Sequence, residues 1–376
     1  MELPGEPPVI RGVASNKQVW SNFAVQSDNH TKGVAIMSQK QQVERFEADN
    51  GAKIYRIPLE LFPGFHGYVH VVLEAGLPTL VDTGSGFESS NNGLLEGFKY
   101  IREHYGEKLA LEDIQRIIIT HGHIDHFGGI AFMLDQVGGA QIGIHELDRR
   151  VLTSYEERVI MVTKDLRIFL ERAGVNPQLR QSLMEMYGFA KQHMRSVPVH
   201  FSLEEDMLLD GLAFFHTPGH CPGQVCVRIG DILLSADHIL ARTTPHQSPE
   251  SITRYNGLGH YLEALQKIER VDGLRLALGG HENPIKDIYG RIAEIRTSHM
   301  RKLNRVLDII RDAGHPMTIS DISKAMYPDK SGYEILLAIE EAGAHVEYLY
   351  QHGQLKVANL DEVEKEDNPA LCYQLA

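Results

Sequence analysis

One short run of the sequence, THGHIDHFGG at residues 120–129, limits what this chain can fold into more than any other feature. It places three imidazoles and one carboxylate within the six residues from His121 to His126. The run directly follows Ile117–Ile119, a β-branched segment that is typical of a buried strand. Imidazole and carboxylate together suit zinc and other borderline divalent metals. We therefore interpret this corner as a metal-binding motif rather than as a polar turn with incidental histidines.

The order of the side chains in this run suits two metal ions that share one site. His121 and His123 alternate and can point to one side, whereas Asp125 and His126 can point to the other. Two ions need more ligands than one loop supplies. The remaining ligands must therefore come from other parts of the chain.

Elsewhere in the sequence, one arrangement recurs: an apolar strand followed by a ligand-type side chain. The expected strands of this kind are residues 79–81, 214–216, 232–236 and 274–278. The ligand-type residues that follow them are Asp82, His220, Asp237 and His281. His220 comes after a Pro-Gly turn, and His281 comes after a pair of glycines. These four residues are the candidates for completing the site.

Taken in order, these motifs resemble those of the metallo-β-lactamase-fold hydrolase superfamily, and in particular its glyoxalase II-like members. The matching motifs are VDTG at residues 81–84, the run at residues 121–126, His220, Asp237 and His281. They cover roughly residues 52–290 of the chain. The resemblance implies an α+β fold, the αββα sandwich, in which two mixed sheets pack face to face with helices outside and metals at one sheet edge.

The resemblance also implies a role for each matching residue. One metal ion would be bound by three imidazoles, those of His121, His123 and His220. A second ion would be bound by Asp125, His126 and His281, with Asp237 as the bridge between the two ions. Asp82 would orient a ligand imidazole without binding metal itself. The expected cofactors are two divalent metal ions, with Zn²⁺ as the default and iron or manganese also compatible with a mixed His/Asp site.

The same resemblance favours hydrolysis. His123 stands where the redox di-iron branch of the superfamily has Glu. A dinuclear site holds a bridging hydroxide, because metal binding lowers the pKa of water from about 16 to about 7. Asp125 is the expected catalytic residue, which takes a proton from the nucleophile or passes one to the leaving group. Cys221 and Ser235 are expected to pack rather than to react.

We therefore expect a dinuclear metal-dependent hydrolase that cleaves an ester, thioester or lactone of a small molecule. A phosphodiesterase or endoribonuclease with the same metal site is the alternative, since all these reactions share attack by metal-bound hydroxide. A non-catalytic binding or regulatory protein is the third hypothesis. It has the least support, because no ligand position has been replaced.

Composition limits the partners and the cellular compartment that we expect for the protein. The formal net charge of −13 over 376 residues argues against nucleic acid and anionic membranes as partners. No apolar run approaches the ~18 residues of a membrane span. The segment that starts at Met1 lacks the basic and apolar regions of a signal peptide. The three cysteines suggest a reducing compartment. We expect a cytoplasmic protein with a small-molecule substrate.

The pattern along the chain divides it into segments. Residues 1–50 read as an N-terminal extension, with Trp20 and Phe23 as its main apolar anchors. Residues 51–290 form the expected catalytic domain. Within it, residues 146–205 are a helical insertion that either caps the site or serves as core packing or a dimer face. His246, in the loop after Asp237, is either a substrate contact or an ordinary loop histidine.

The C-terminal part reads as a small winged-helix-like domain, residues 291–360, followed by an acidic tail, residues 361–376. It contains three helical segments and an expected hairpin made by Val346–Tyr350 and Leu355–Val357. The helix that would read nucleic acid carries three acids and neither Lys nor Arg over residues 334–341. This composition is wrong for phosphate binding and favours packing or homodimerisation.

Overall fold

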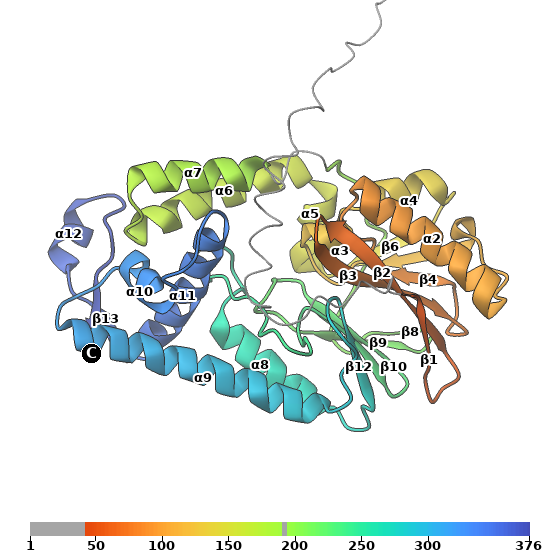
Figure 1. Ribbon diagram of the computed structural model, residues 1–376. Helices are drawn as coiled ribbons and strands as arrows, with labels where there is room; N and C mark the ends of the chain where they lie inside the picture. The colour runs from red at the N-terminus through yellow and green to blue at the C-terminus, as the bar shows by residue number, and fades with distance from the viewer. Residues whose placement is uncertain (1–41, 190–193) are drawn as a thin grey trace, which may run out of the picture.

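The computed structural model describes residues 42–189 and 194–376. Two β-sheets lie face to face, and helices cover their outer sides (Figure 1). The αββα sandwich expected from the sequence is confirmed. Trp20 and Phe23 of the N-terminal extension lie outside the described residues.

The first sheet has seven strands in chain order within the described residues. They are β1 (Glu44–Glu47), β2 (Lys53–Phe62), β3 (Phe65–Leu73), β4 (Thr79–Val81), β5 (Arg116–Ile118), β6 (Gln141–Ile144) and β7 (Phe201–Ser202). Strands β1 to β4 pair antiparallel, and β4 to β7 pair parallel. Because β1 pairs with β2, the sheet begins inside the segment that the sequence pattern assigned to the N-terminal extension.

The second sheet has five strands in the order β12-β11-β10-β9-β8. They are β8 (Leu208–Leu209), β9 (Leu212–His216), β10 (Val225–Ile229), β11 (Ile232–Ala236) and β12 (Leu276–Gly279). Only β11 and β12 pair parallel. Parallel strands end at the same sheet edge, so the segments that follow β11 and β12 leave the sheet side by side.

Apolar side chains from both sheets fill the space between them. Ile54 of β2 and Ile118 of β5 meet Phe214 of β9 and Leu234 of β11 in one buried cluster. Each of these four side chains is at most 1% exposed. Since side chains of a strand alternate between its two faces, one face of each sheet supplies this core and the other packs against helices.

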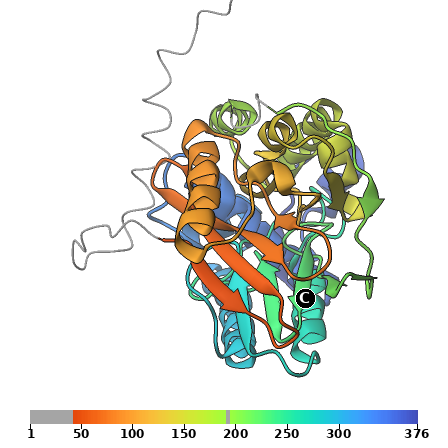
Figure 2. The ribbon, with the colours of Figure 1, turned by 90° about the vertical axis from the view of Figure 1, so that its right-hand side faces the viewer.

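Helix α2 (Glu88–Tyr105) covers the outer face of the first sheet (Figure 2). Its buried residues Leu94, Phe98 and Ile101 follow a helical spacing and pack into one cluster with β2 and β3. The helix ends at Gly106, whose φ of 71° is the left-handed conformation that favours glycine. Short helical turns join the following strands: η2 (Leu111–Asp113), α3 (Ile124–Phe127) and α4 (Ile130–Gln136).

Residues 146–189 are mostly helical, whereas β7 at Phe201–Ser202, inside the range expected for the helical insertion, belongs to the first sheet. The helical part comprises η3 (Glu146–Asp148), α5 (Arg149–Thr153), α6 (Tyr155–Arg172) and α7 (Pro177–Phe189). Figure 1 shows α6 and α7 above the C-terminal helices. Helix α8 (Leu258–Glu269) follows β11 along the chain. The C-terminal helices are α9 (Ile288–Ala313), α10 (Ile319–Met326), α11 (Glu334–Gln351) and α12 (Leu360–Lys365).

These helices share one core. Phe169 of α6, Leu265 of α8, Ile292 of α9 and Ile339 of α11 belong to a single buried cluster. The backbone also joins the two regions, because the amide of Ser320 donates to the carbonyl of Ala173 at 2.8 Å. The insertion and the C-terminal helices therefore form one helical body beside the sandwich.

The hairpin expected over residues 346–357 is wrong. Val346–Tyr350 continues α11, where Val346 and Leu349 are buried at helical spacing. Tertiary packing therefore overrides the β-propensity of these β-branched and aromatic residues. Strand β13 (Leu355–Val357) instead pairs with β14 (Tyr373–Leu375), so the end of the expected acidic tail belongs to a small sheet.

No helix in the described ranges combines the length and the apolar composition that a bilayer span needs.

A matched pair of leucines tests the core between the sheets. Leu234→Ala removes a side chain that is 1% exposed, so we expect a loss of about 2–5 kcal/mol in the free energy of unfolding. Leu208→Ala, at a site 72% exposed, is the control and should change stability by less than about 0.5 kcal/mol. Urea unfolding followed by circular dichroism measures both. Equal losses for the two variants would contradict the assignment of this core.

Candidate metal centre

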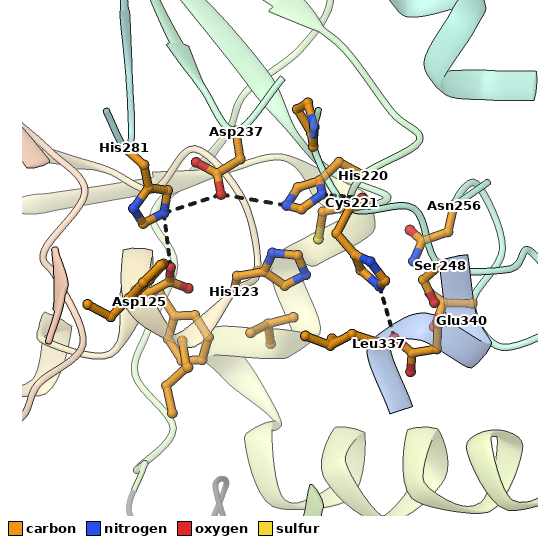
Figure 3. A pocket seen from close by; sticks show the side chains of 18 of the residues that line it. His123, Asp125, His220, Cys221, Asp237, Ser248, Asn256, His281, Leu337 and Glu340 are labelled. Carbon is orange, nitrogen blue, oxygen red and sulfur yellow. Dashed lines mark hydrogen bonds and ion pairs between the residues drawn. The ribbon is translucent and has the colours of Figure 1, made fainter. Parts of the chain in front are cut away.

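The ends of several strands bring the ligand-type residues to one edge of the sandwich. The loop after β5 carries the run from His121 to His126, and β11 and β12 lead directly to Asp237 and His281. His220 follows β9 in the turn before β10. Figure 3 shows His281, Asp237 and His220 in a row, with Asp125 and His123 facing them. The structure thus brings together all seven residues that the sequence singled out as metal ligands.

Three imidazoles form the first group, His121, His123 and His220. One ring nitrogen from each lies within 4.8 Å of those of the other two. The closest approach is 3.0 Å, between Nε2 of His121 and Nδ1 of His123. Three neutral imidazoles at this separation present three lone pairs toward one point, which is the donor set of many zinc sites.

Two carboxylates and two imidazoles form the second group, Asp125, His126, Asp237 and His281. Nε2 of His281 lies 3.2 Å from Oδ2 of Asp125 and 3.4 Å from Oδ2 of Asp237. Oδ1 of Asp237 lies 3.4 Å from Nε2 of His126. Asp237 also reaches the first group, because its Oδ2 is 3.7 Å from Nε2 of His220. This carboxylate therefore lies between the two groups.

The outward nitrogens of the imidazoles are held by fixed partners. Nδ1 of His126 lies 2.8 Å from Oδ2 of Asp82, whose other oxygen accepts from the amide of Thr120 at 2.8 Å. Nδ1 of His281 lies 2.9 Å from the carbonyl oxygen of His66. Nδ1 of His220 lies 2.8 Å from the carbonyl oxygen of His246. Each partner fixes the ring and leaves Nε2 facing inward.

Burial and charge set the two groups apart electrostatically. Burial, with the neighbouring imidazoles, lowers the pKa of His121 well below its ordinary value and that of His123 to about 3. In the second group, burial lowers the pKa of the imidazoles, but the negative charges of Asp237 and Asp125 outweigh this effect. They hold the pKa of His126 well above its ordinary value and raise the pKa of His281 to about 10. The first group is therefore made of neutral donors, and the second is balanced by carboxylates.

The atoms that face inward fit divalent metal ions. Nε2 of His126, Nε2 of His220 and Oδ1 of Asp237 are buried and have no hydrogen-bond partner among the described residues. Buried polar atoms without a partner are costly, and a cation bound between them would satisfy all three. The donor set of imidazole nitrogen and carboxylate oxygen is the one that zinc, iron and manganese accept.

A glycine makes the close approach of the ligands feasible. A Cβ atom added at Gly280 would lie 2.6 Å from Oδ1 of Asp237 and 2.6 Å from Cε1 of His126. Any larger residue at this position would push two ligands apart. Gly280, the glycine immediately before His281, is therefore required by the packing of the site.

Members of both groups line a cavity of ≈ 890 Å³, namely His123, Asp125, His220, Asp237 and His281. This volume falls within the range of about 300–1,000 Å³ for small-molecule sites. Helix α6 contributes Tyr155, Val159 and Leu166 to the lining, and α11 contributes Leu337 and Glu340. Helix α6 of the insertion therefore contributes to the cavity wall and, through Phe169 and Leu170, to the helical core.

Cys221 and Ser235 point to neighbouring groups of the protein. The thiol of Cys221 donates to Oδ2 of Asp148 at 3.2 Å, and the hydroxyl of Ser235 donates to the carbonyl of Ile239 at 2.9 Å. Burial raises the pKa of the Cys221 thiol well above its ordinary value. Both side chains act in packing, as the sequence suggested.

Sequence reasoning missed two sets of residues at the site. Asp148 is fully buried and accepts from the amide of Gly122 at 2.8 Å, which fixes the turn between His121 and His123. Glu340 and Glu341 of α11 reach the loop that contains His246. No local pattern marks these three acids, because each meets its partner through contacts distant in the sequence.

Comparison with known proteins agrees with the geometry. The family model of the metallo-beta-lactamase superfamily matches residues 63–281. A probable metallo-hydrolase of Bacillus subtilis (strain 168) is 22% identical over 284 residues, which cover 72% of this chain and 84% of the relative.

Two solved structures share the fold over most of the chain. A metallo-beta-lactamase family protein from Thermus thermophilus is 23% identical with a TM-score of 0.67, over 86% of this chain and 98% of that one. A beta-lactamase domain protein from Burkholderia ambifaria is 21% identical with a TM-score of 0.65, over 90% and 98% of the two chains. The likeness in fold therefore extends beyond residues 63–281.

Removal of the carboxylate that holds His126 should weaken metal binding. Asp82→Ala takes away the acceptor at Nδ1 of His126 without removing a proposed ligand, so we expect roughly 10- to 100-fold weaker retention of metal. The measurement is equilibrium dialysis against a chelator, with metal content read by mass spectrometry. Asp210→Ala is the control, because Asp210 pairs with Arg116 at the opposite end of β5. Unchanged retention in Asp82→Ala would contradict the orienting role.

Proposed function

The chain belongs to the metallo-beta-lactamase superfamily and is a metal-dependent hydrolase, and we propose that it cleaves an ester, thioester or lactone of a small molecule with two divalent ions. One observation carries this proposal: side chains from two adjacent groups of metal ligands line one cavity. The superfamily supplies the reaction type, and the cavity supplies the argument for a small substrate.

The proposed ligands follow the two groups. His121, His123 and His220 would hold one ion, and Asp125, His126 and His281 would hold the other. Asp237 would bridge them, because its carboxylate lies within 3.7 Å of imidazole nitrogens from both groups. When bound, divalent ions supply Lewis acidity and lower the pKa of water toward neutrality. Zn²⁺ is the ion that we propose first for this donor set.

The chain's own residues orient the substrate and handle the proton. Asp125 lies at the cavity wall with Oδ2 3.2 Å from Nε2 of His281. Burial by itself would raise the pKa of Asp125, but the charge of His126 and the hydrogen bond from His281 outweigh it. Together they lower the pKa of Asp125 to about 2, so its carboxylate is ionised. We propose that Asp125 takes a proton from the nucleophile or passes one to the leaving group.

The residues that line the cavity limit the range of substrates that we propose. Tyr155, Val162 and Leu166 give α6 an apolar face toward the site, which suits an acyl chain or a ring and excludes water from it. Arg158 and Arg242 add cationic charge at the same wall, which suits an anionic group elsewhere on the substrate. An acyl thioester or an acidic lactone combines both features.

A phosphodiesterase or endoribonuclease remains the alternative, because it would use the same ligands. The acids Glu340 and Glu341 weaken this alternative, because they turn toward the catalytic part and pair with His246 there. Helix α11 of the proposed winged-helix-like region thus presents the carboxylate of Glu340 to the cavity. Negative charge at that position opposes binding of a phosphate backbone.

A substrate panel tests the proposal. Zinc-loaded protein should cleave an acyl thioester or a homoserine-type lactone with multiple turnovers and leave an activated phosphodiester largely intact. Asp125→Asn and His121→Ala should each abolish turnover, and they serve as blanks. Selective cleavage of the phosphodiester would replace this proposal with the alternative, and near-normal rates in either variant would remove the site assignment.

Metal counting tests the two groups separately. We expect two equivalents of zinc per chain, and His220→Ala and His281→Ala should each lose one of them, because each residue belongs to a different group. Metal content after gel filtration gives the stoichiometry. His104→Ala, on the surface helix α2, is the control. Loss of both ions in both variants would show that the groups do not bind independently.

A further inference from the structure

The imidazole of His220 depends on a backbone carbonyl for its orientation. Nδ1 of His220 lies 2.8 Å from the carbonyl oxygen of His246, so the ring donates outward and turns Nε2 toward Asp237. A carbonyl cannot be exchanged by mutation, and its position is set by whatever holds the surrounding loop. That loop runs from β11 to α8.

Helix α11 holds this loop through a carboxylate. Oε2 of Glu341 accepts a hydrogen bond from the amide of Gln247 at 2.8 Å and lies 3.4 Å from Nδ1 of His246. Oε2 of Glu340 lies 3.1 Å from Nε2 of the same imidazole. The two acids therefore hold the His246 side chain and the next peptide unit. The dashed line to Glu340 in Figure 3 marks the contact of Glu340.

Glu341 is anchored within the C-terminal helices. Its side chain is 9% exposed, and its Oε1 accepts from the ammonium of Lys302 on α9 at 2.6 Å. On the same two helices, Nδ1 of His299 on α9 lies 3.1 Å from Nε2 of His345 on α11, and both rings are buried. A buried carboxylate with Lys302 at one oxygen and the amide of Gln247 at the other has one favourable position, and displacement would leave its charge unpaired.

The neighbouring histidines do not turn Glu341 into a further metal site. His299, Glu341 and His345 lie close enough together to ligate a cation. However, Lys302 occupies one oxygen of Glu341, and the amide of Gln247 occupies the other. Nδ1 of His345 lies 2.6 Å from the carbonyl oxygen of Glu341, so it serves α11 itself. Among the described residues, Nε2 of His299 is the one ligand-type atom of this cluster without a hydrogen-bond partner, and a single free nitrogen does not make a metal site.

We propose that Glu341 is a positioning residue for the metal-ligand group of His121, His123 and His220, and that the C-terminal helices are in this way an integral part of the metal centre. The inference rests on the proposed ligand role of His220. The path has three steps: Lys302 fixes Glu341, Glu341 fixes the peptide at Gln247, and the carbonyl of His246 fixes the ring of His220.

This assignment explains why α11 carries acidic residues, which a role in nucleic-acid binding would not explain. The same helix lines the cavity through Leu337 and Glu340, so its position affects both the substrate wall and one ligand. A shift of α11 would move the carbonyl of His246 and rotate the imidazole of His220. The other ligand group, which His281 completes, has its own outer partner in the carbonyl of His66 and should not respond.

The test compares two glutamates of one helix. Glu341→Ala removes the contact to the peptide at Gln247. Glu347→Ala is the matched control, because Glu347 also lies on α11 and accepts from Ser251 of the same loop, farther along the chain from His246. Competition with a chromophoric chelator measures the affinity of each ion, and the absorption spectrum of Co²⁺-substituted protein reports its ligand geometry.

We expect Glu341→Ala to bind one ion roughly 10- to 100-fold more weakly, with a changed Co²⁺ spectrum, whereas the second ion stays at its wild-type affinity. Glu347→Ala should match the wild type. Glu341→Gln should fall between the two, because its amide oxygen still accepts from Gln247. If Glu341→Ala does not fold, Glu341→Gln is compared with Glu347→Gln instead.

Wild-type affinities and spectra in the Glu341 variants would overturn the inference, provided that His220→Ala loses one ion. Retention of both ions by His220→Ala would instead overturn the ligand assignment of the proposed function. Equal weakening of both ions in Glu341→Ala would also overturn the inference, because it would indicate a general loss of structure.

Discussion

The buried carboxylate of Asp237 is the group on which the rest of the structure depends. It is 7% exposed and lies within 3.7 Å of imidazole nitrogens from His126, His220 and His281. A carboxylate removed from water must be compensated by cations or hydrogen-bond donors. Its partners come from both sheets, because His126 follows β5 of the first sheet and His281 follows β12 of the second. The charge of one side chain thus joins the sheets at the edge where the cavity opens.

Main-chain atoms orient two of the ligand imidazoles, through the carbonyls of His66 and His246. Two others have side-chain partners, Asp82 for His126 and Thr120 for His121. Backbone carbonyls take their positions from the whole fold. The precision of the centre therefore depends on elements distant from it, including the hairpin of β2 and β3 and the loop after Asp237.

The C-terminal helices show how far this dependence reaches. They share a core with α6 and place Glu340 and Glu341 against the His246 loop. The acidic face of α11, which argued from sequence against nucleic-acid binding, pairs with cationic side chains inside the molecule. Lys302 of α9 completes this network. A region that looks like an appended domain in the sequence is packed into the wall of the site.

The sequence alone determined the strands near the site and the seven ligand candidates, because strand ends and ligand spacing are local properties of the chain. Its resemblance to the superfamily implied the sandwich. The three helical segments expected in the C-terminal part are present as α9, α10 and α11. The expected hairpin at Val346 failed because packing against α9 and α10, not local propensity, decides that segment. Only the tertiary structure decided that Asp148, Glu340 and Glu341 reach the site. Such contacts join residues far apart in the chain, and two of their partners, Gly122 and Gln247, are reached through backbone amides that carry no sequence signal.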